Sequence, residues 1–350
     1  MRNKQPEGRW AGIDLTKALA ICAVLLIHCS ADHFACHQVG SPRWLAAAFY
    51  GCVSRWAVPV FLLCSGALMN GPERELPLGK LFGKYLLRLA SSLAVWSVFY
   101  EGCRLWLSRG SAPMGDLIRQ AGRNLLCGTT YYHLYYFWLV FALYLALPLT
   151  RLIARHAPTA ELRYLLTLWL FSGGVLQFLQ YFWPFSQMRA SLLYLMIPSA
   201  ALGPGLGLLG WYLYQHPPKR WYPPLLLFLL SFGVSFLGTW RRSAAAGALE
   251  PLYLDGMGLF SLLMAIGIFR FCQWAGDRRR ELPGAVRFVS QASFCVYLVH
   301  PFFQALAKPA FFLTLPVYFA VPAQAALLLV LSLGAYWVLR RVPVVSRWLI

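Results

Sequence analysis

Residues 12–32 read GIDLTKALAICAVLLIHCSAD, an apolar stretch of 21 residues. A helix that crosses the hydrocarbon core of a bilayer needs about 20 mainly apolar residues. Comparable stretches recur along the whole chain, at 45–69, 81–107, 132–152, 163–182, 190–214, 223–240, 255–274, 288–307 and 319–340. The sequence therefore predicts an all-α, polytopic transmembrane helix bundle of about ten spans.

The composition points to the same class of protein. Of the 350 residues, 59% are apolar and 12% are charged, with a mean hydropathy of +0.57, whereas an average soluble domain carries about 25% charged residues. The stretch 108–130 is more polar, so we expect it to lie along the membrane interface. We expect helix breaks within Pro198–Gly210, which is rich in proline and glycine. Residues 1–350 are expected to form a single membrane domain with no appended soluble domain.

The net charge of +19 has a distribution that excludes nucleic-acid binding. Lysines and arginines fall in short loops between apolar stretches and form no continuous basic stripe, and no phosphate-loop or zinc-finger spacing occurs. Across the ten expected spans, 20 of the 31 Lys and Arg residues fall on one side and nine on the other. Because the side richer in Lys and Arg faces the cytoplasm, both termini are predicted to be cytoplasmic.

We predict neither a disulfide framework among the cysteines nor a metal site in the one cluster of possible metal ligands. The nine cysteines lie mostly in apolar stretches without a CxxC pair, which predicts embedded thiols. The alternative is a disulfide bridge near one membrane face among Cys29, Cys36, Cys52 and Cys127. A cluster of possible metal ligands follows the first span: Cys29, Asp32, His33, Cys36 and His37. A zinc site is one interpretation of this cluster. No HExxH motif is present, however, and we expect no metal.

The first span carries polar side chains that are costly inside a bilayer. Lys17 and His28 are eleven residues apart, so at about 100° per residue they share one helix face, about 16 Å apart along the axis. Asp14 is placed to pair with Lys17, and His28 has an imidazole that exchanges protons near neutral pH. The alternative interpretation has Lys17 snorkelling to the interface and His28 bonding a neighbouring helix. If the helix continues to Asp32, that carboxylate is placed to orient His28.

Other polar residues extend this pattern to a second level of the bundle. Arg55, His133 and His300 all fall in the outer half of their spans, together with His28. Lys84 and Arg88 lie near the cytoplasmic face with Lys17. This arrangement suits a polyanionic donor that arrives from the cytosol and a proton-transfer centre further out. Taken singly, Arg55, His133 and His300 are as readily explained as packing or interfacial residues.

At these residues the chain resembles the membrane acyltransferase-3 family of bacterial O-acyltransferases. The resemblance rests on Asp14, Lys17 and His28 in the first span, on SRWAVPVFLLCSG at 54–66, on YHL at 132–134 and on Tyr297 with His300. It covers essentially the whole chain and is greatest for short stand-alone members such as the O-acetyltransferase of enterobacterial common antigen. Two departures from the family pattern are Tyr135, where a tryptophan is usual, and Tyr85, where a second arginine is usual.

The resemblance implies an acyl-CoA-dependent O-acetyltransferase, a single transmembrane acyltransferase domain of the bacterial inner membrane. Acetyl-CoA is then the acyl donor, with its phosphates near Lys17, Lys84 and Arg88, and a hydroxyl of an envelope glycan or lipid-linked sugar is the acceptor. His28 is expected to act as general base and Arg55 or His133 to stabilise the oxyanion. The supporting residues are Asp14, Ser65, Tyr297 and His300.

Three alternatives stay open at this point. An acyl group bound covalently to His28 or Ser65 would replace direct transfer. A transporter of a glycan or other anionic solute would also use broken helices and charges near the membrane midplane. A non-catalytic membrane partner is the third alternative, against which the presence of Lys17 and His28 argues.

Overall fold

The computed structural model describes residues 11–71, 75–108, 111–198, 202–279, 281–307 and 309–350. These residues form helices and connecting turns, and no strand occurs among them. Within the described residues, seven helical stretches are long and apolar enough to cross a membrane: Ala11–Cys36, Pro42–Met69, Met114–His156, Thr159–Leu179, Tyr222–Ala246, Pro251–Asp277 and Val317–Leu339. The predicted all-α class with multiple membrane-type helices is therefore confirmed, while the count of ten spans and the side of the termini stay predictions.

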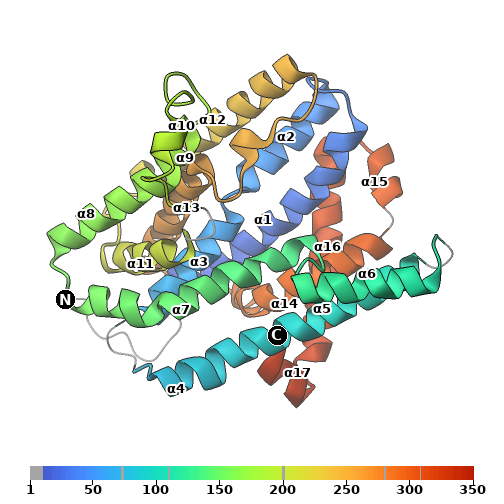
Figure 1. Ribbon diagram of the computed structural model, residues 1–350, viewed down its shortest axis with the longest axis horizontal. Helices are drawn as coiled ribbons and strands as arrows, with labels where there is room; N and C mark the ends of the chain where they lie inside the picture. Colours follow the sequence, from blue (N-terminus) through green and yellow to red (C-terminus); the bar gives the residue numbers. More distant parts are fainter. Residues whose placement is uncertain (1–10, 72–74, 109–110, 199–201, 280, 308) are drawn as a thin grey trace.

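Helix α1 (Ala11–Cys36) lies inside the bundle. It contacts α2 (Pro42–Ser54), α3 (Ala57–Met69), α13 (Leu259–Asp277), α14 (Gly284–Leu306) and α16 (Val317–Leu339) (Figure 1). Apolar side chains around its whole circumference are buried, which is why the helix carries no single apolar stripe. Polar side chains on α1 are therefore held among neighbouring helices.

The stretch predicted as one span at 45–69 is two helices. Helix α2 begins after Ser41, whose Oγ accepts a hydrogen bond of 3.3 Å from the backbone N–H of Trp44. It ends at Ser54, and α3 begins at Ala57, so that Arg55 lies in the turn between the helices. The indole Nε1 of Trp56 donates to the carbonyl oxygen of Val53 at 2.7 Å and so satisfies a carbonyl that the break exposes.

Helix α11 (Leu202–Gln215) corrects only part of the prediction of breaks within Pro198–Gly210: Pro198 is not helical, residues 199–201 lie outside the described residues, and 202–210 are helical. Its described part, from residue 202, is an unbroken helix; the chain departs from helix earlier, in turns at 193–195 that follow α10 (Arg189–Leu192). The glycines of α11 instead allow this helix to pack closely against α3. A Cβ built on Gly66 of α3 would lie 2.0 Å from the carbonyl oxygen of Gly207, and one built on Gly210 would lie 2.1 Å from that of Leu63. Small residues let two membrane helices approach in this way.

Helix α6 (Met114–Cys127) lies in the stretch expected at the interface. It is amphipathic: Leu117 and Ala121 are buried, while Arg119 and Arg123 are exposed. The side-chain amide of Asn124 donates to Oε1 of the buried Glu101 at 3.0 Å and so ties α6 to α5 (Leu87–Leu107). An interfacial position of α6 stays a prediction.

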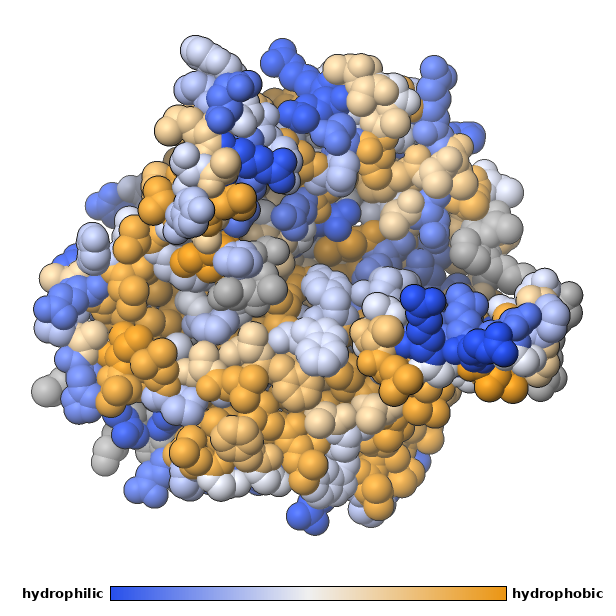
Figure 2. All heavy atoms as spheres, in the orientation of Figure 1, coloured by the Kyte–Doolittle hydropathy of each residue, from blue (hydrophilic) through white to orange (hydrophobic). Residues whose placement is uncertain are grey.

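The remaining helices complete the outer wall of the bundle. They are α4 (Leu78–Lys80), the π-helix η1 (Leu81–Leu86), the 3-10 turn η2 (Tyr132–Leu134), α7 (Tyr135–His156), α8 (Thr159–Leu170), the π-helix η3 (Phe171–Val175), α9 (Leu176–Leu179), α12 (Tyr222–Ala246), the 3-10 turn η5 (Pro251–Leu254), α15 (Pro309–Thr314) and α17 (Pro343–Trp348). On α7, Leu145, Leu149 and Leu152 are more than half exposed. Figure 2 shows that hydrophobic surface covers the part of this face where α7 and α5 lie, as expected of a lipid-facing surface.

Candidate active site

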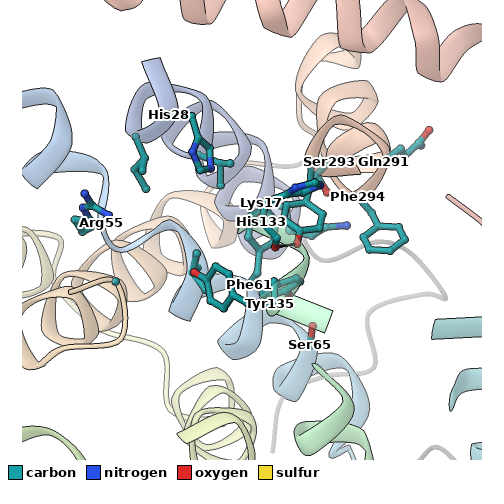
Figure 3. A pocket seen from close by; sticks show the side chains of 16 residues that line it. Lys17, His28, Arg55, Phe61, Ser65, His133, Tyr135, Gln291, Ser293 and Phe294 are labelled. Carbon is teal, nitrogen blue, oxygen red and sulfur yellow. Dashed lines mark hydrogen bonds between the residues drawn. The ribbon is translucent and has the colours of Figure 1, made fainter. Parts of the chain in front are cut away.

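A cavity of about 310 Å³ lies beside α1, and we call it the central cavity. Side chains from α1, α3, η2, α7 and α14 and from the Arg55 turn line it (Figure 3). It brings together six of the residues that the sequence singled out: Lys17, His28, Arg55, Ser65, His133 and Tyr297. These residues come from segments far apart in the chain, so the cavity is a product of the tertiary fold.

The periodicity argument for α1 holds in three dimensions. The helix is continuous from Ala11 to Cys36, and Lys17 and His28 line the same cavity. Asp14 is buried, and its Oδ1 accepts a hydrogen bond from Oγ of Ser290 on α14. Asp14 therefore joins α1 to α14 at the Lys17 end of the cavity.

Arg55 owes its position to the break between α2 and α3. Its backbone N–H donates to the carbonyl oxygen of Cys52 at 3.3 Å, which closes the last turn of α2. The side chain is half-buried, and its Nε has no hydrogen-bond partner among the described residues. In Figure 3 Arg55 lies across the cavity from Ser293 and Phe294. A buried N–H without a partner is costly, which favours an anionic or carbonyl group as its natural companion.

Three imidazoles form a cluster at one end of the central cavity. The ring centroid of His300 lies 5.1 Å from that of His28 and 5.8 Å from that of His133. His300 is fully buried and does not line the cavity, so it lies behind the two other rings. Its Nδ1 is 3.0 Å from the carbonyl oxygen of Val296. A carbonyl only accepts, so Nδ1 carries the proton and neutral His300 presents a lone pair on Nε2.

Tyrosines enclose His133 on η2. The hydroxyl of Tyr297 donates to the backbone carbonyl oxygen of His133. The ring of Tyr100 lies edge-on at 5.0 Å from the His133 ring, and Tyr297 lies at 5.2 Å. Both ring nitrogens of His133 are buried without a hydrogen-bond partner among the described residues. Packing, rather than hydrogen bonding of the ring, fixes this imidazole at the cavity wall.

Lys84 and Arg88 do not line the central cavity. Both are exposed, Lys84 on η1 and Arg88 on α5, where a guanidinium nitrogen of Arg88 donates to the carbonyl oxygen of Ile350. The neighbouring Tyr85 contacts Tyr144 of α7 with ring centroids 6.3 Å apart. Tyr144 follows the cavity residue Tyr135 by nine residues, or about 13 Å of helix axis. The segment that carries Lys84 therefore packs beside this part of α7.

The structure adds lining residues that the sequence analysis did not select. Tyr136, Gln291, Ser293 and Phe294 line the central cavity, next to Val58 and Phe61 from the segment 54–66 already singled out. Gln291 and Ser293 are polar residues within the apolar stretch 288–307, and this signal was available in the sequence. The aromatic residues carried no such signal, because aromatic side chains are common throughout the chain.

The prediction that the cysteines form no disulfide framework agrees with the fold. All nine cysteines belong to the described residues, and each is a free thiol, Cys29, Cys36, Cys52 and Cys127 included. Nδ1 of His33 lies 3.4 Å from Nε2 of His37. Across the described part of the chain, no group of three or more His, Cys, Asp or Glu side chains is placed to hold a metal ion.

Comparison with known proteins fits the architecture and the cavity. The family model of the acyltransferase-3 domain, described as an acyltransferase domain, matches residues 10–341. This match spans nearly the whole chain and includes every segment that lines the central cavity. The protein belongs to the acyltransferase-3 family, a family of membrane acyltransferases. Searches of curated proteins and of solved structures gave no match.

Proposed function

We propose that the protein transfers an acetyl or other short acyl group from cytosolic acyl-CoA to a hydroxyl of an envelope glycan or lipid-linked sugar. The proposal places it in the bacterial inner membrane as a single transmembrane acyltransferase domain. One observation carries it: a single cavity is lined by a cationic residue, Lys17, at one level and by two imidazoles and a guanidinium, those of His28, His133 and Arg55. Acyl transfer needs a base and positive groups around the carbonyl in this kind of arrangement.

The donor half of the proposal rests on the placement of positive charge. Lys17 precedes His28 by eleven residues of continuous helix, or about 16 Å, and Lys84 lies on η1, whose Tyr85 contacts Tyr144 of α7. Phosphates of an acyl-CoA pair well with lysine and arginine. Lys84 and Arg88 are exposed and therefore suited to the nucleotide end, whereas Lys17 lies inside the cavity where the pantetheine arm would pass.

The chemical step is direct transfer. His28 accepts the proton of an acceptor hydroxyl as its oxygen attacks the thioester carbonyl. The new ester C–O bond forms, the C–S bond breaks, and His28 returns the proton to the departing thiolate, giving the acyl ester and free coenzyme A. A positioned general base contributes about 10²–10⁴-fold to such a rate.

Arg55 and the cluster behind His28 complete the proposed chemistry. The unpartnered Nε of Arg55 suits a developing oxyanion. Tyr297 fixes η2 through the His133 carbonyl and so holds that imidazole at the cavity wall. His300, fixed by Val296, supports the ring of His28 from behind.

Transfer of labelled acetyl from acetyl-CoA to membrane glycans tests the proposal, with wild type compared with His28→Ala at matched expression. We expect loss of transfer with coenzyme A binding retained. His216→Ala is the matched control, because His216 is exposed at the end of α11 and hydrogen-bonds Tyr212 at 2.9 Å. Equal transfer by wild type and His28→Ala would refute His28 as the base. Solute uptake without acetyl transfer would establish the transporter alternative.

A further inference from the structure

A second cavity, of about 410 Å³, adjoins His28 and has no role in the chemistry described above. We call it the Asp32 cavity; its lining residues are His28, Ala31, Asp32, Tyr131, Tyr132, Pro301, Gln304 and Ala305. His28 is the one residue that lines both this cavity and the central cavity. A group in the Asp32 cavity can therefore reach the same imidazole as a group in the central cavity.

The order of residues along α1 separates the two cavities. Lys17 precedes His28 by eleven residues, and Asp32 follows it by four on the same continuous helix. Lys17 thus lies about 16 Å to one side of His28 and Asp32 about 6 Å to the other. A donor that occupies the Lys17 side leaves the Asp32 side for the acceptor.

The polar groups of the Asp32 cavity are held in place and retain bonding capacity. Nε2 of Gln304 donates both to Oδ2 of Asp32, at 3.3 Å, and to the backbone carbonyl oxygen of His28, at 3.2 Å. This network anchors α14 to the end of α1 and fixes the carboxylate. Oε1 of Gln304 has no hydrogen-bond partner among the described residues. The cavity therefore offers the fixed carboxylate of Asp32 as an acceptor to a ligand rich in hydroxyl donors.

Aromatic rings form the opposite wall. The ring of Tyr132 lies 5.1 Å from that of His28 and 4.9 Å from that of Tyr131, and Tyr132 is 52% exposed. Flat aromatic faces beside a fixed carboxylate suit a sugar ring, whose C–H faces are apolar and whose hydroxyls lie at the edge. Figure 2 shows this face of the molecule hollowed above α6, with hydrophilic side chains around the hollow.

Resting on the proposed function, we infer that the Asp32 cavity is the subsite for the acceptor sugar, with Asp32 holding its hydroxyls, Gln304 fixing that carboxylate and Tyr132 stacking on the ring. The sugar then presents one hydroxyl to His28 while the acyl thioester lies on the other side of the imidazole. A third cavity, of about 530 Å³, is lined by Arg55 and Asp255 and lacks His28. A hydroxyl bound only there would not meet His28, the base of the proposed step, so we assign the acceptor to the Asp32 cavity.

Steady-state kinetics with a defined probe test the assignment. The probe is envelope glycan from the producing strain, freed of esters by mild alkali, titrated against labelled acetyl-CoA with purified full-length protein. For Asp32→Asn and Tyr132→Leu we expect the half-saturating glycan concentration to rise at least tenfold, equivalent to about 1.4 kcal/mol. The KM for acetyl-CoA should stay within twofold of wild type.

Matched variants separate binding from general damage. Asp116→Asn and Tyr194→Leu change an exposed aspartate and a tyrosine that is 92% exposed, both outside the three cavities, and should leave both constants unchanged. A rise in the half-saturating glycan concentration for Asp255→Asn but not for Asp32→Asn would overturn the assignment in favour of the third cavity, which Asp255 lines. Equal rises in both KM values for Asp32→Asn would also overturn it, since a shift of His28 would explain them. Absence of transfer by wild type would refute the proposed function itself.

Discussion

Replacement of Gly66 by alanine should separate α3 from α11 and distort the central cavity. A Cβ on Gly66 lies 2.0 Å from the carbonyl oxygen and 2.3 Å from the Cα of Gly207, while ordinary van der Waals contact begins at 3.4 Å. The obstacle is backbone that no rotamer change can move. The helices must therefore part locally by about 1.4 Å. Overpacking of this kind destabilises a protein by about 1–3 kcal/mol.

The same displacement should reach the chemistry, because α3 carries the cavity residues Phe61 and Ser65. A misplacement of about 1 Å costs on the order of 10²-fold in rate. We therefore expect Gly66→Ala to lower kcat for acetyl transfer about 100-fold, and to lower the unfolding temperature in detergent.

Gly233→Ala is the matched control, since Gly233 lies within α12 and a Cβ there meets nothing within 4 Å. It should retain wild-type activity and gain slightly in stability, by up to about 1 kcal/mol from helix propensity. If Gly66→Ala resembles Gly233→Ala in both unfolding temperature and rate, the inferred close contact between α3 and α11 is wrong.

Three further substitutions probe other parts of the account. Glu101→Gln should lower the unfolding temperature, at a cost of about 1–3 kcal/mol, because it removes the charge that pairs with Arg104 at 2.6 Å. Lys84→Gln should raise the KM for acetyl-CoA, with little change in kcat, if that lysine meets donor phosphates. His300→Gln should lower kcat more than either KM, because its bond to Val296 positions the ring behind His28.

Each of these has its own control. Asp116→Asn removes an exposed ion pair of 3.4 Å and should leave the unfolding temperature unchanged. Lys219→Gln, at an exposed lysine beside α12, should leave the KM for acetyl-CoA unchanged. His216→Gln should leave kcat unchanged. A Lys84→Gln enzyme with wild-type KM would exclude Lys84 from donor binding, and a His300→Gln enzyme with wild-type kcat would exclude a positioning role.

Periodicity and composition predict the fold class and the key feature of α1. Helical spacing alone places Lys17 and His28 on one face, and both line one cavity. The interruption at Arg55 had one signal in the sequence: Pro59, four residues later, has no N–H to donate to the Arg55 carbonyl. The apolar pattern nevertheless runs through the break, which is why a single span was predicted. At this break the indole Nε1 of Trp56 donates a hydrogen bond to the carbonyl oxygen of Val53.

Contacts between segments distant in the sequence could not be predicted from the sequence. The Pro- and Gly-rich stretch indicated helix breaks, yet Gly207 and Gly210 are helical and are needed where α11 meets α3. The hydroxyl of Tyr297 bonds the carbonyl oxygen of His133 across 164 positions of sequence. Such pairings depend on which helices become neighbours, and a single sequence does not state this.

In the proposed mechanism, donor and acceptor meet at His28 from two sides, and the acyl group passes directly between them. Initial rates of acetyl transfer, measured over a grid of acetyl-CoA and glycan concentrations, test this mechanism. Direct transfer requires both substrates to be bound at once, so we expect intersecting lines in double-reciprocal plots. Parallel lines, together with labelled acetyl bound to the protein before acceptor is added, would contradict it and indicate a covalent intermediate at His28 or Ser65.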